Sequence, residues 1–144
     1  MNKKAHTTKK LFSRETTVST LINTEPEKIW NILVDVGNYK NWNSTIISIE
    51  GEIKAGGEIK IVPAINPNRT FKLKIKAFEP YTKMVSGDAI GSRIFLLEKV
   101  SEVTQFTMTE KIGGPLFPLF AKMIPPFDDA FDAYARDLKT VAEK

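Results

Sequence analysis

The sequence predicts one α+β domain in which a curved antiparallel β-sheet wraps around a long C-terminal α-helix. Apolar side chains alternate with a period of two through most of positions 46–112, as in strands with one buried face. Short turns rich in glycine, proline and asparagine separate these strands, which favours an antiparallel meander. From Phe127 to Val141 the apolar spacing becomes three and four residues, the pattern of an amphipathic helix. Only this helix is long enough to cover one face of the sheet.

The first fifteen residues are predicted to be a flexible basic tail, and residues 16–144 to be the single domain that a chain of this length supports. The net charge of the whole chain is +4, and the tail alone accounts for it. Five basic residues in the tail, against Glu15, give the same value: Lys3, Lys4, Lys9, Lys10 and Arg14. Nucleic-acid binding needs a positive field on the folded surface, so we expect no nucleic-acid partner.

Two small helices are predicted after the first strand. The β-branched segment 16–22 reads as that strand, and Pro26 marks a helix start because the first helical turn tolerates proline. Gly37 ends this helix, and residues 38–43 suit a short helical turn or a loop.

Five or six strands are predicted between positions 46 and 112. Segment 71–77 shows the clearest alternation, with Lys72, Lys74 and Lys76 on the solvent face. No aromatic residue lies between these lysines to stack on bases, which favours a solvated face over an RNA platform. Ser101 and Glu102 suit a two-residue hairpin turn, and residues 116–124 a short helix before the terminal one.

Several short motifs resemble the SRPBCC superfamily, and within it the polyketide cyclase/dehydrase-like group, which is related to START lipid-transfer domains and to the pollen-allergen fold. The motifs are Pro26, Ile29-Trp30, Asp35-Val36, Tyr39, Trp42-Asn43, Gly56-Gly57, Phe78-Glu79-Pro80, Thr104, Phe106, Glu110 and Gly114. The resemblance covers about residues 16–144 and implies a helix-grip fold with a deep apolar cavity between the sheet and the long helix. Many members carry a histidine where this chain has Met108, and a tryptophan near Ser86. These two differences weaken any inference that this chain shares the catalytic chemistry of those members.

The side chains that face inward from the meander and the helices are expected to line this cavity. They are Trp30, Trp42, Ile59, Ile61, Phe71, Leu73, Ile75, Met84, Ser86, Arg93, Phe95, Leu97, Phe106, Met108, Glu110, Phe117, Phe120, Phe127, Phe131 and Tyr134. The same residues are core side chains if the interior is filled, so the resemblance to the family is what favours a hollow.

Glu110 is expected on the same inward face of its strand as Phe106 and Met108. A carboxylate buried there needs a partner. The favoured interpretation is a strand-end glutamate paired with Arg93 or water at the rim. The alternative is a group that orients a ligand or acts as a general acid or base. For Arg93, a surface role is favoured over contact with a ligand. For Trp30 and Trp42, ordinary packing is favoured over an aromatic gate.

Composition excludes several catalytic classes. The chain has no cysteine and a single histidine, His6, so one chain cannot form a Ser-His-Asp triad, a Cys-His pair or a histidine metal cluster. Asp128, Asp129 and Asp132 lie near a predicted helix N-terminus, where carboxylates complement the helix dipole. We therefore predict no metal site and no cofactor.

The leading functional hypothesis is a cytoplasmic protein, monomeric or homodimeric, that binds a small hydrophobic ligand such as a lipid or a polyketide-like molecule. One alternative is an enzyme resembling polyketide cyclases and dehydratases, with Glu110 as its weak catalytic candidate. Another is a protein-partner or chaperone-regulator module, which an exposed patch at Leu116, Phe117 and Phe120 would favour. No segment approaches the length of a transmembrane span or forms a secretory signal, so no integral membrane association is expected.

Overall fold

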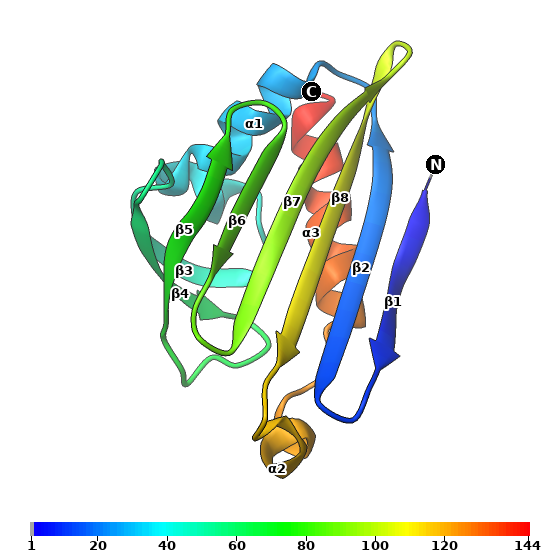
Figure 1. Cartoon of the computed structure of the whole chain (residues 1–144). Helices are drawn as coiled ribbons and strands as arrows, with labels where there is room; N and C mark the ends of the chain where they lie inside the picture. The colour runs from blue at the N-terminus through cyan, green and yellow to red at the C-terminus, as the bar shows by residue number, and fades with distance from the viewer. Residues whose placement is uncertain (1) are drawn as a thin grey trace.

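The computed structural model describes residues 2–144 and contains eight strands, three α-helices and two 3₁₀ turns (Figure 1). The elements are β1 (Lys3–Lys9), β2 (Ser13–Ile22), α1 (Pro26–Val34), η1 (Val36–Asn41), β3 (Ile46–Gly51), β4 (Glu58–Pro63), β5 (Phe71–Glu79), β6 (Lys83–Gly87), β7 (Gly91–Val100), β8 (Val103–Gly113), α2 (Phe117–Phe120), η2 (Ala121–Met123) and α3 (Asp128–Ala142).

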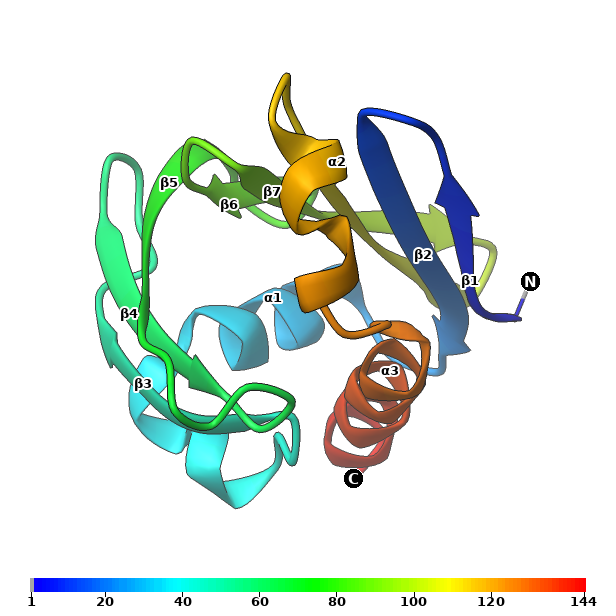
Figure 2. The same ribbon diagram turned by 90° about the horizontal axis from the view of Figure 1, so that it is seen from below.

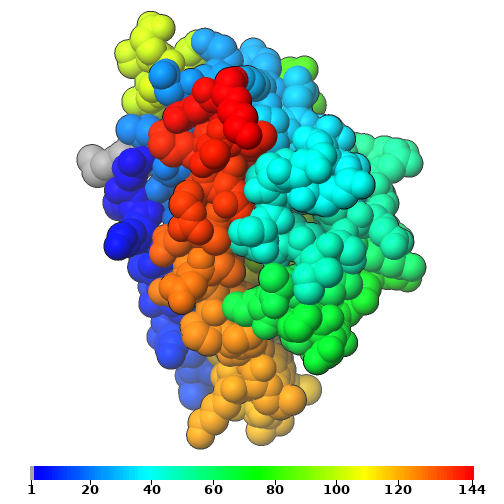
Figure 3. Space-filling view, turned by 180° about the vertical axis from the view of Figure 1, so that it is seen from behind, coloured from blue at the N-terminus to red at the C-terminus, as the bar shows by residue number. Residues whose placement is uncertain are grey.

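The eight strands form one antiparallel sheet in the order β1-β2-β8-β7-β6-β5-β4-β3. The sheet curves without closing, and α3 packs inside the curve (Figure 2). From behind, α3 lies between the N-terminal strands on one side and the segment from α1 to β4 on the other (Figure 3). This arrangement confirms the predicted α+β class, with a curved antiparallel sheet around a C-terminal helix. Strands β3 to β8 are the predicted meander, and Ser101 and Glu102 form its two-residue turn between Val100 and Val103.

Strand β1 corrects the prediction of a tail through residue 15. Lys3–Lys9 pair with β2 at the edge of the sheet, and two carboxylates of α3 hold them there. The Thr7 hydroxyl donates a hydrogen bond to Asp128 at 2.5 Å, and the Ala5 N–H donates to Asp132 at 2.7 Å. Since the basic segment is part of the fold, the argument against nucleic acid from a loose tail no longer holds. The absence of a nucleic-acid partner stays a prediction.

The helices follow the sequence patterns in part. α1 begins at Pro26 and is followed by the short turn η1, as expected. The single helix expected at 116–124 is instead two short turns, α2 and η2; Pro118 is tolerated in the first turn of α2, and Pro125 follows the end of η2. α3 buries Phe131, Tyr134, Ala135, Leu138 and Ala142 along one stripe; the spacing predicts the first, second and fourth of these, whereas Phe127 and Val141, also expected there, are only partly buried.

A register shift in β5 changes which side chains face inward near its end. The pairing with β6 is irregular between Ile75 and Ala77, which is the position of a β-bulge. Beyond the bulge Phe78 packs against the core, with its ring 5.2 Å from that of Trp30. The bulge therefore fills one end of the sheet interior with aromatic side chains.

Candidate functional site

A cavity of about 670 Å³ lies between the inner face of the sheet and α3. Most of its wall is apolar. Fifteen of the predicted cavity residues line it: Ile59, Ile61, Phe71, Leu73, Ile75, Met84, Ser86, Arg93, Phe95, Met108, Glu110, Phe120, Phe127, Phe131 and Tyr134. Strand phase accounts for eleven of these fifteen, because alternate residues of a strand face the same side of a sheet, but the fifteen are fewer than half of the residues that line the cavity.

The other five predicted residues lie outside the cavity wall. Trp30 is 4% exposed and packs edge-on against Phe78, while Trp42 contacts the rings of Tyr39 and Tyr134. The remaining three belong to the packed interior: Leu97, Phe106 and Phe117. The favoured interpretation of the tryptophans as ordinary packing fits these contacts, and neither forms a gate. Period-two patterns show which face of a strand is buried, but they do not show which end of that face is filled.

Sequence reasoning missed the part of the wall that comes from loops and from strand β3. The residues include Tyr39, Ile46, Ile49, Ile53, Ile65, Asn66, Asn68, Arg69, Asp88, Ile90, Met123, Ile124 and Pro125. Ile46 and Ile49 lie in a predicted strand, so the strand prediction could have included them among the cavity residues. The loop residues carry no periodic signal. Apart from Tyr39 in η1 and Ile53 in the β3–β4 loop, they come from three connections, namely the β4–β5 loop, the β6–β7 turn and the segment after α2.

A row of polar side chains crosses the inner face of the sheet. Ser86 on β6 is opposite Arg93 on β7, Arg93 is opposite Glu110 on β8, and Glu110 is opposite Thr16 on β2. The Thr16 hydroxyl lies 2.8 Å from that of Thr7 on β1. Ser86, Arg93 and Glu110 line the cavity. The row places polar groups on the sheet side of a mainly apolar cavity, in addition to the loop residues Asn66, Asn68, Arg69 and Asp88.

Arg93 and Glu110 form the ion pair that the sequence interpretation favoured for the glutamate. The Arg93 Nε donates to Glu110 Oε1 at 2.8 Å, and the two side chains are 27% and 15% exposed. The Arg93 guanidinium lies 4.9 Å from the centre of the Phe131 ring. Arg93 therefore lines the cavity, and its favoured surface role is wrong. The pair supplies the partner that a partly buried carboxylate requires.

Arg14 fixes the segment between α2 and α3 against the sheet. It is 8% exposed, and its two terminal nitrogens donate to the carbonyl oxygens of Ile124 (3.1 Å) and Pro125 (2.8 Å). Its guanidinium lies 5.0 Å from the centre of the Phe127 ring. Burial lowers the pKa of Arg14, and the charges of Asp128 and Glu110 oppose this shift. Because Ile124, Pro125 and Phe127 line the cavity, Arg14 positions that part of its wall.

Two buried tyrosines, Tyr39 and Tyr134, also line the cavity. The Tyr39 hydroxyl donates to the carbonyl oxygen of Leu33. Burial raises the pKa of Tyr39 well above its ordinary value, and burial also raises the pKa of Tyr134, with hydrogen bonding to Tyr39 acting in the opposite direction. Both side chains are therefore neutral phenols at neutral pH.

Metal binding receives no support from the side-chain arrangement. Among residues 2–144, no group of three or more histidine, cysteine, aspartate or glutamate side chains could hold an ion. Asp128 and Asp132 bind β1, as described above. None of the helices in the described part of the chain combines the length and the apolar character needed to cross a bilayer.

No protein-family model matches the chain, and neither does any curated protein. Solved structures match over most of its length. A Rhodobacter sphaeroides protein is 16% identical with a TM-score of 0.71, covering 96% of this chain and 97% of that protein. A START superfamily protein from Mycobacterium smegmatis is 12% identical with a TM-score of 0.65, covering 90% and 97%.

DynU16, a protein of the dynemicin biosynthetic locus, is 12% identical with a TM-score of 0.67, and the match covers 90% of this chain but 47% of DynU16. Identities this low establish the fold alone. The chain therefore shares the fold of these neighbours, one of which is a START superfamily protein, and in this chain the fold is a curved antiparallel sheet around a C-terminal helix.

Proposed function

We propose that the chain binds a small, mainly apolar ligand in the cavity between the sheet and α3. The observation that carries this proposal is a largely apolar cavity of about 670 Å³ with a limited number of polar groups in its wall. Ligand sites in proteins usually measure about 300–1,000 Å³ and combine an apolar wall with a few polar groups that fix orientation. Lipids and polyketide-like molecules have the matching chemistry.

The ligand's apolar body would lie against Ile59, Ile61 and Leu73, and its polar end would face Arg93 and Glu110. A guanidinium carries five N–H donors, and the bond to Glu110 uses the one on Nε. The remaining donors suit a carboxylate, ketone or hydroxyl. Native mass spectrometry of the freshly purified protein should detect such a molecule if it co-purifies.

Filling the cavity with a tryptophan should abolish ligand binding. Leu73 lines the cavity, whereas its neighbour Lys72 is exposed on the outer face of β5. In Leu73→Trp the indole occupies space that the ligand needs, so we expect the affinity for the neutral probe N-phenyl-1-naphthylamine to fall more than about tenfold. Lys72→Trp should bind as the wild type does. Equal affinities for the two variants would place the probe elsewhere and contradict the proposal.

Glu110→Gln tests how the polar side of the cavity acts on a ligand. The change removes a negative charge and frees Arg93 while keeping the side chain's size. An anionic probe, cis-parinaric acid, should bind about tenfold more tightly, because Arg93 can then pair with its carboxylate. The neutral probe should change by less than about threefold. A tenfold loss for both probes would mean that Glu110 itself orients the ligand.

A cyclase-like enzyme is the second candidate, and the position of Glu110 in the cavity is the observation that favours it. DynU16, with the same fold, belongs to a biosynthetic locus. A glutamate can transfer protons to a polyketone, whereas glutamine cannot. If the chain is such an enzyme, Glu110→Gln should abolish product formation from a poly-ketone analogue while binding persists. Absence of product with the wild type would remove this candidate for that substrate class.

A further inference from the structure

Large exposed hydrophobic side chains concentrate at one end of the molecule. In the part of the chain that the structure describes there are nine, and six of them come from three neighbouring connections: Leu11, Phe12, Ile90, Leu116, Leu119 and Met123. We call these six residues the apolar tip. Leu119 and Met123 are each 80% exposed and Leu11 is 70% exposed. Single exposed hydrophobic residues are ordinary, but a cluster marks an interaction surface.

Backbone hydrogen bonds hold the three connections of the apolar tip together. The Gly114 N–H donates to the Phe12 carbonyl oxygen at 3.0 Å, which joins the segment before α2 to the β1–β2 turn. The Gly113 N–H donates to the Ile90 carbonyl oxygen at 3.1 Å, which joins the same segment to the β6–β7 turn. In Figure 1, α2 projects beyond the sheet at this end. The tip is thus one continuous feature.

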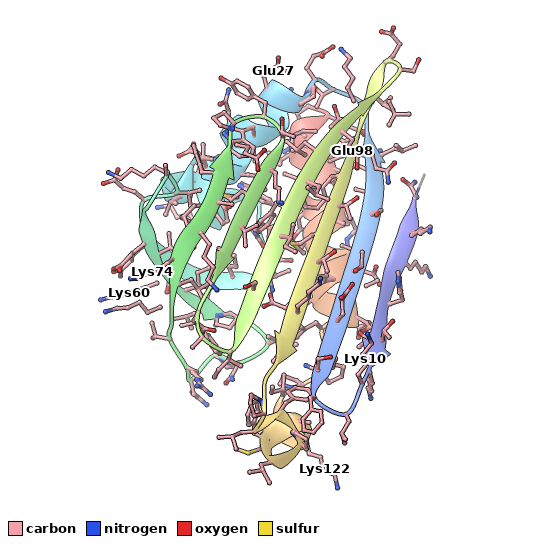
Figure 4. All side chains as sticks on the ribbon, viewed as in Figure 1. Lys10, Glu27, Lys60, Lys74, Glu98 and Lys122 are labelled. Atoms are coloured by element: carbon pink, nitrogen blue, oxygen red, sulfur yellow. The ribbon has the colours of Figure 1, made fainter. Side chains whose placement is uncertain are left out.

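Lysines flank the apolar tip. Lys9 and Lys10 directly precede Leu11, and Lys122 precedes Met123; all three are exposed. Figure 4 shows Lys10 and Lys122 at this end of the molecule, opposite the end that carries Glu27 and Glu98. Within residues 2–144, none of the three lysines lies within salt-bridge distance of a carboxylate. Their charge is available to a partner.

From this combination we propose that the apolar tip docks on the surface of a lipid bilayer that carries anionic headgroups. Leucine, phenylalanine and methionine gain free energy by entering the interfacial region, and neighbouring lysines gain by contact with anionic lipid. A two-fold contact between two copies would instead bring the same lysines together. Ile90 and Met123 also line the cavity, so docking places that end of the cavity against the bilayer.

Vesicle flotation tests the apolar part of this contact. The full chain should bind vesicles of phosphatidylcholine mixed with phosphatidylglycerol. Leu116→Asp combined with Leu119→Asp should lower the partition coefficient more than about tenfold, because both side chains are exposed at the tip. The matched control is Ile47→Asp combined with Val100→Asp, which replaces exposed hydrophobic residues elsewhere and should bind as the wild type does.

Charge reversal tests the electrostatic part. Lys10→Glu combined with Lys122→Glu should lower binding to the anionic vesicles more than about tenfold. Lys60→Glu combined with Lys74→Glu changes the net charge equally on strands away from the tip (Figure 4) and should have a much smaller effect. Wild-type binding to pure phosphatidylcholine should be correspondingly weak.

Three results would overturn the docking proposal. One is wild-type protein that does not float with anionic vesicles. The second is equal loss in the tip variants and their controls. The third is concentration-dependent dimerisation that the Leu116→Asp/Leu119→Asp variant loses, because the occupant of the tip would then be a second copy. Neither leucine lines the cavity, so probe binding is a separate readout, and failure of ligand binding leaves this test intact.

Discussion

Phe106→Ala should lower the free energy of unfolding by about 3–5 kcal/mol, the usual cost of removing a buried aromatic ring. Phe106 has no exposed surface and does not border the cavity. Its ring stacks on that of Tyr134 at 6.3 Å and lies 6.5 Å from that of Phe95. All the contacts of the ring are therefore lost at once, and the packed strands around it leave little freedom to collapse. Urea unfolding followed by circular dichroism measures the change.

Phe131→Ala is the matched comparison for this prediction. Phe131 is only 1% exposed, but its ring borders the cavity. Since one side of the ring already faces empty space, fewer contacts are lost, and we expect a cost of about 2–3 kcal/mol. Equal costs for the two variants would indicate that side chains fill the cavity in solution. A cost below about 1 kcal/mol for Phe131→Ala would mean that the helix presents a different face to the sheet.

Gly51→Ala should be the other strongly destabilising change. Gly51 ends β3 with a φ of +108°, and a Cβ atom there would lie 2.1 Å from the backbone carbonyl oxygen of Glu58. Backbone strain and overpacking each cost about 1–3 kcal/mol, so the sum is about 2–6 kcal/mol. The obstructing atom belongs to the β4 backbone, so relief requires the β3–β4 hairpin to open. Thermal and urea unfolding should both detect the loss.

Substitutions at two other glycines separate the contribution of backbone strain from that of overpacking. Gly56 has a φ of +72° but open space around its Cα, so Gly56→Ala should show backbone strain alone, about 1 kcal/mol. Gly37 has open space and no positive φ. Gly37→Ala should be neutral or stabilising by up to about 1 kcal/mol. If Gly51→Ala cost no more than Gly56→Ala, the close β3–β4 approach would be wrong.

The sequence predicts the architecture well where the signal is periodic. Alternation along β5, β7 and β8 assigns Leu73, Phe95 and Met108 to the interior, and the helical spacing assigns Phe131 and Tyr134 to the face of α3 that meets them. Each of these assignments depends only on which side of a strand or helix a residue occupies. That information is local.

The sequence-based predictions fail where contacts between residues far apart in the chain determine the structure. The β1 segment contains one apolar residue, Ala5, and its place in the sheet depends on pairing with β2 and on Asp128 and Asp132 of α3. Trp30 has the spacing of a core helix residue, but only the β5 bulge determines that Phe78 packs against it. The polar row likewise depends on strand register, and the sequence alone does not fix that register.

The pairing of β2 with β8 also shapes how the chain reaches its fold. About 80 residues, 23–102, separate the two strands, although Val18 lies opposite Met108 in the finished sheet. At about 5–20 residues per second, a ribosome needs several seconds to supply the partner strand. During that interval the edge of β2 that pairs with β8 has no partner. Lysines near an unpaired edge oppose pairing with other chains, and the segment that becomes β1 supplies three of them next to β2, Lys3, Lys4 and Lys9.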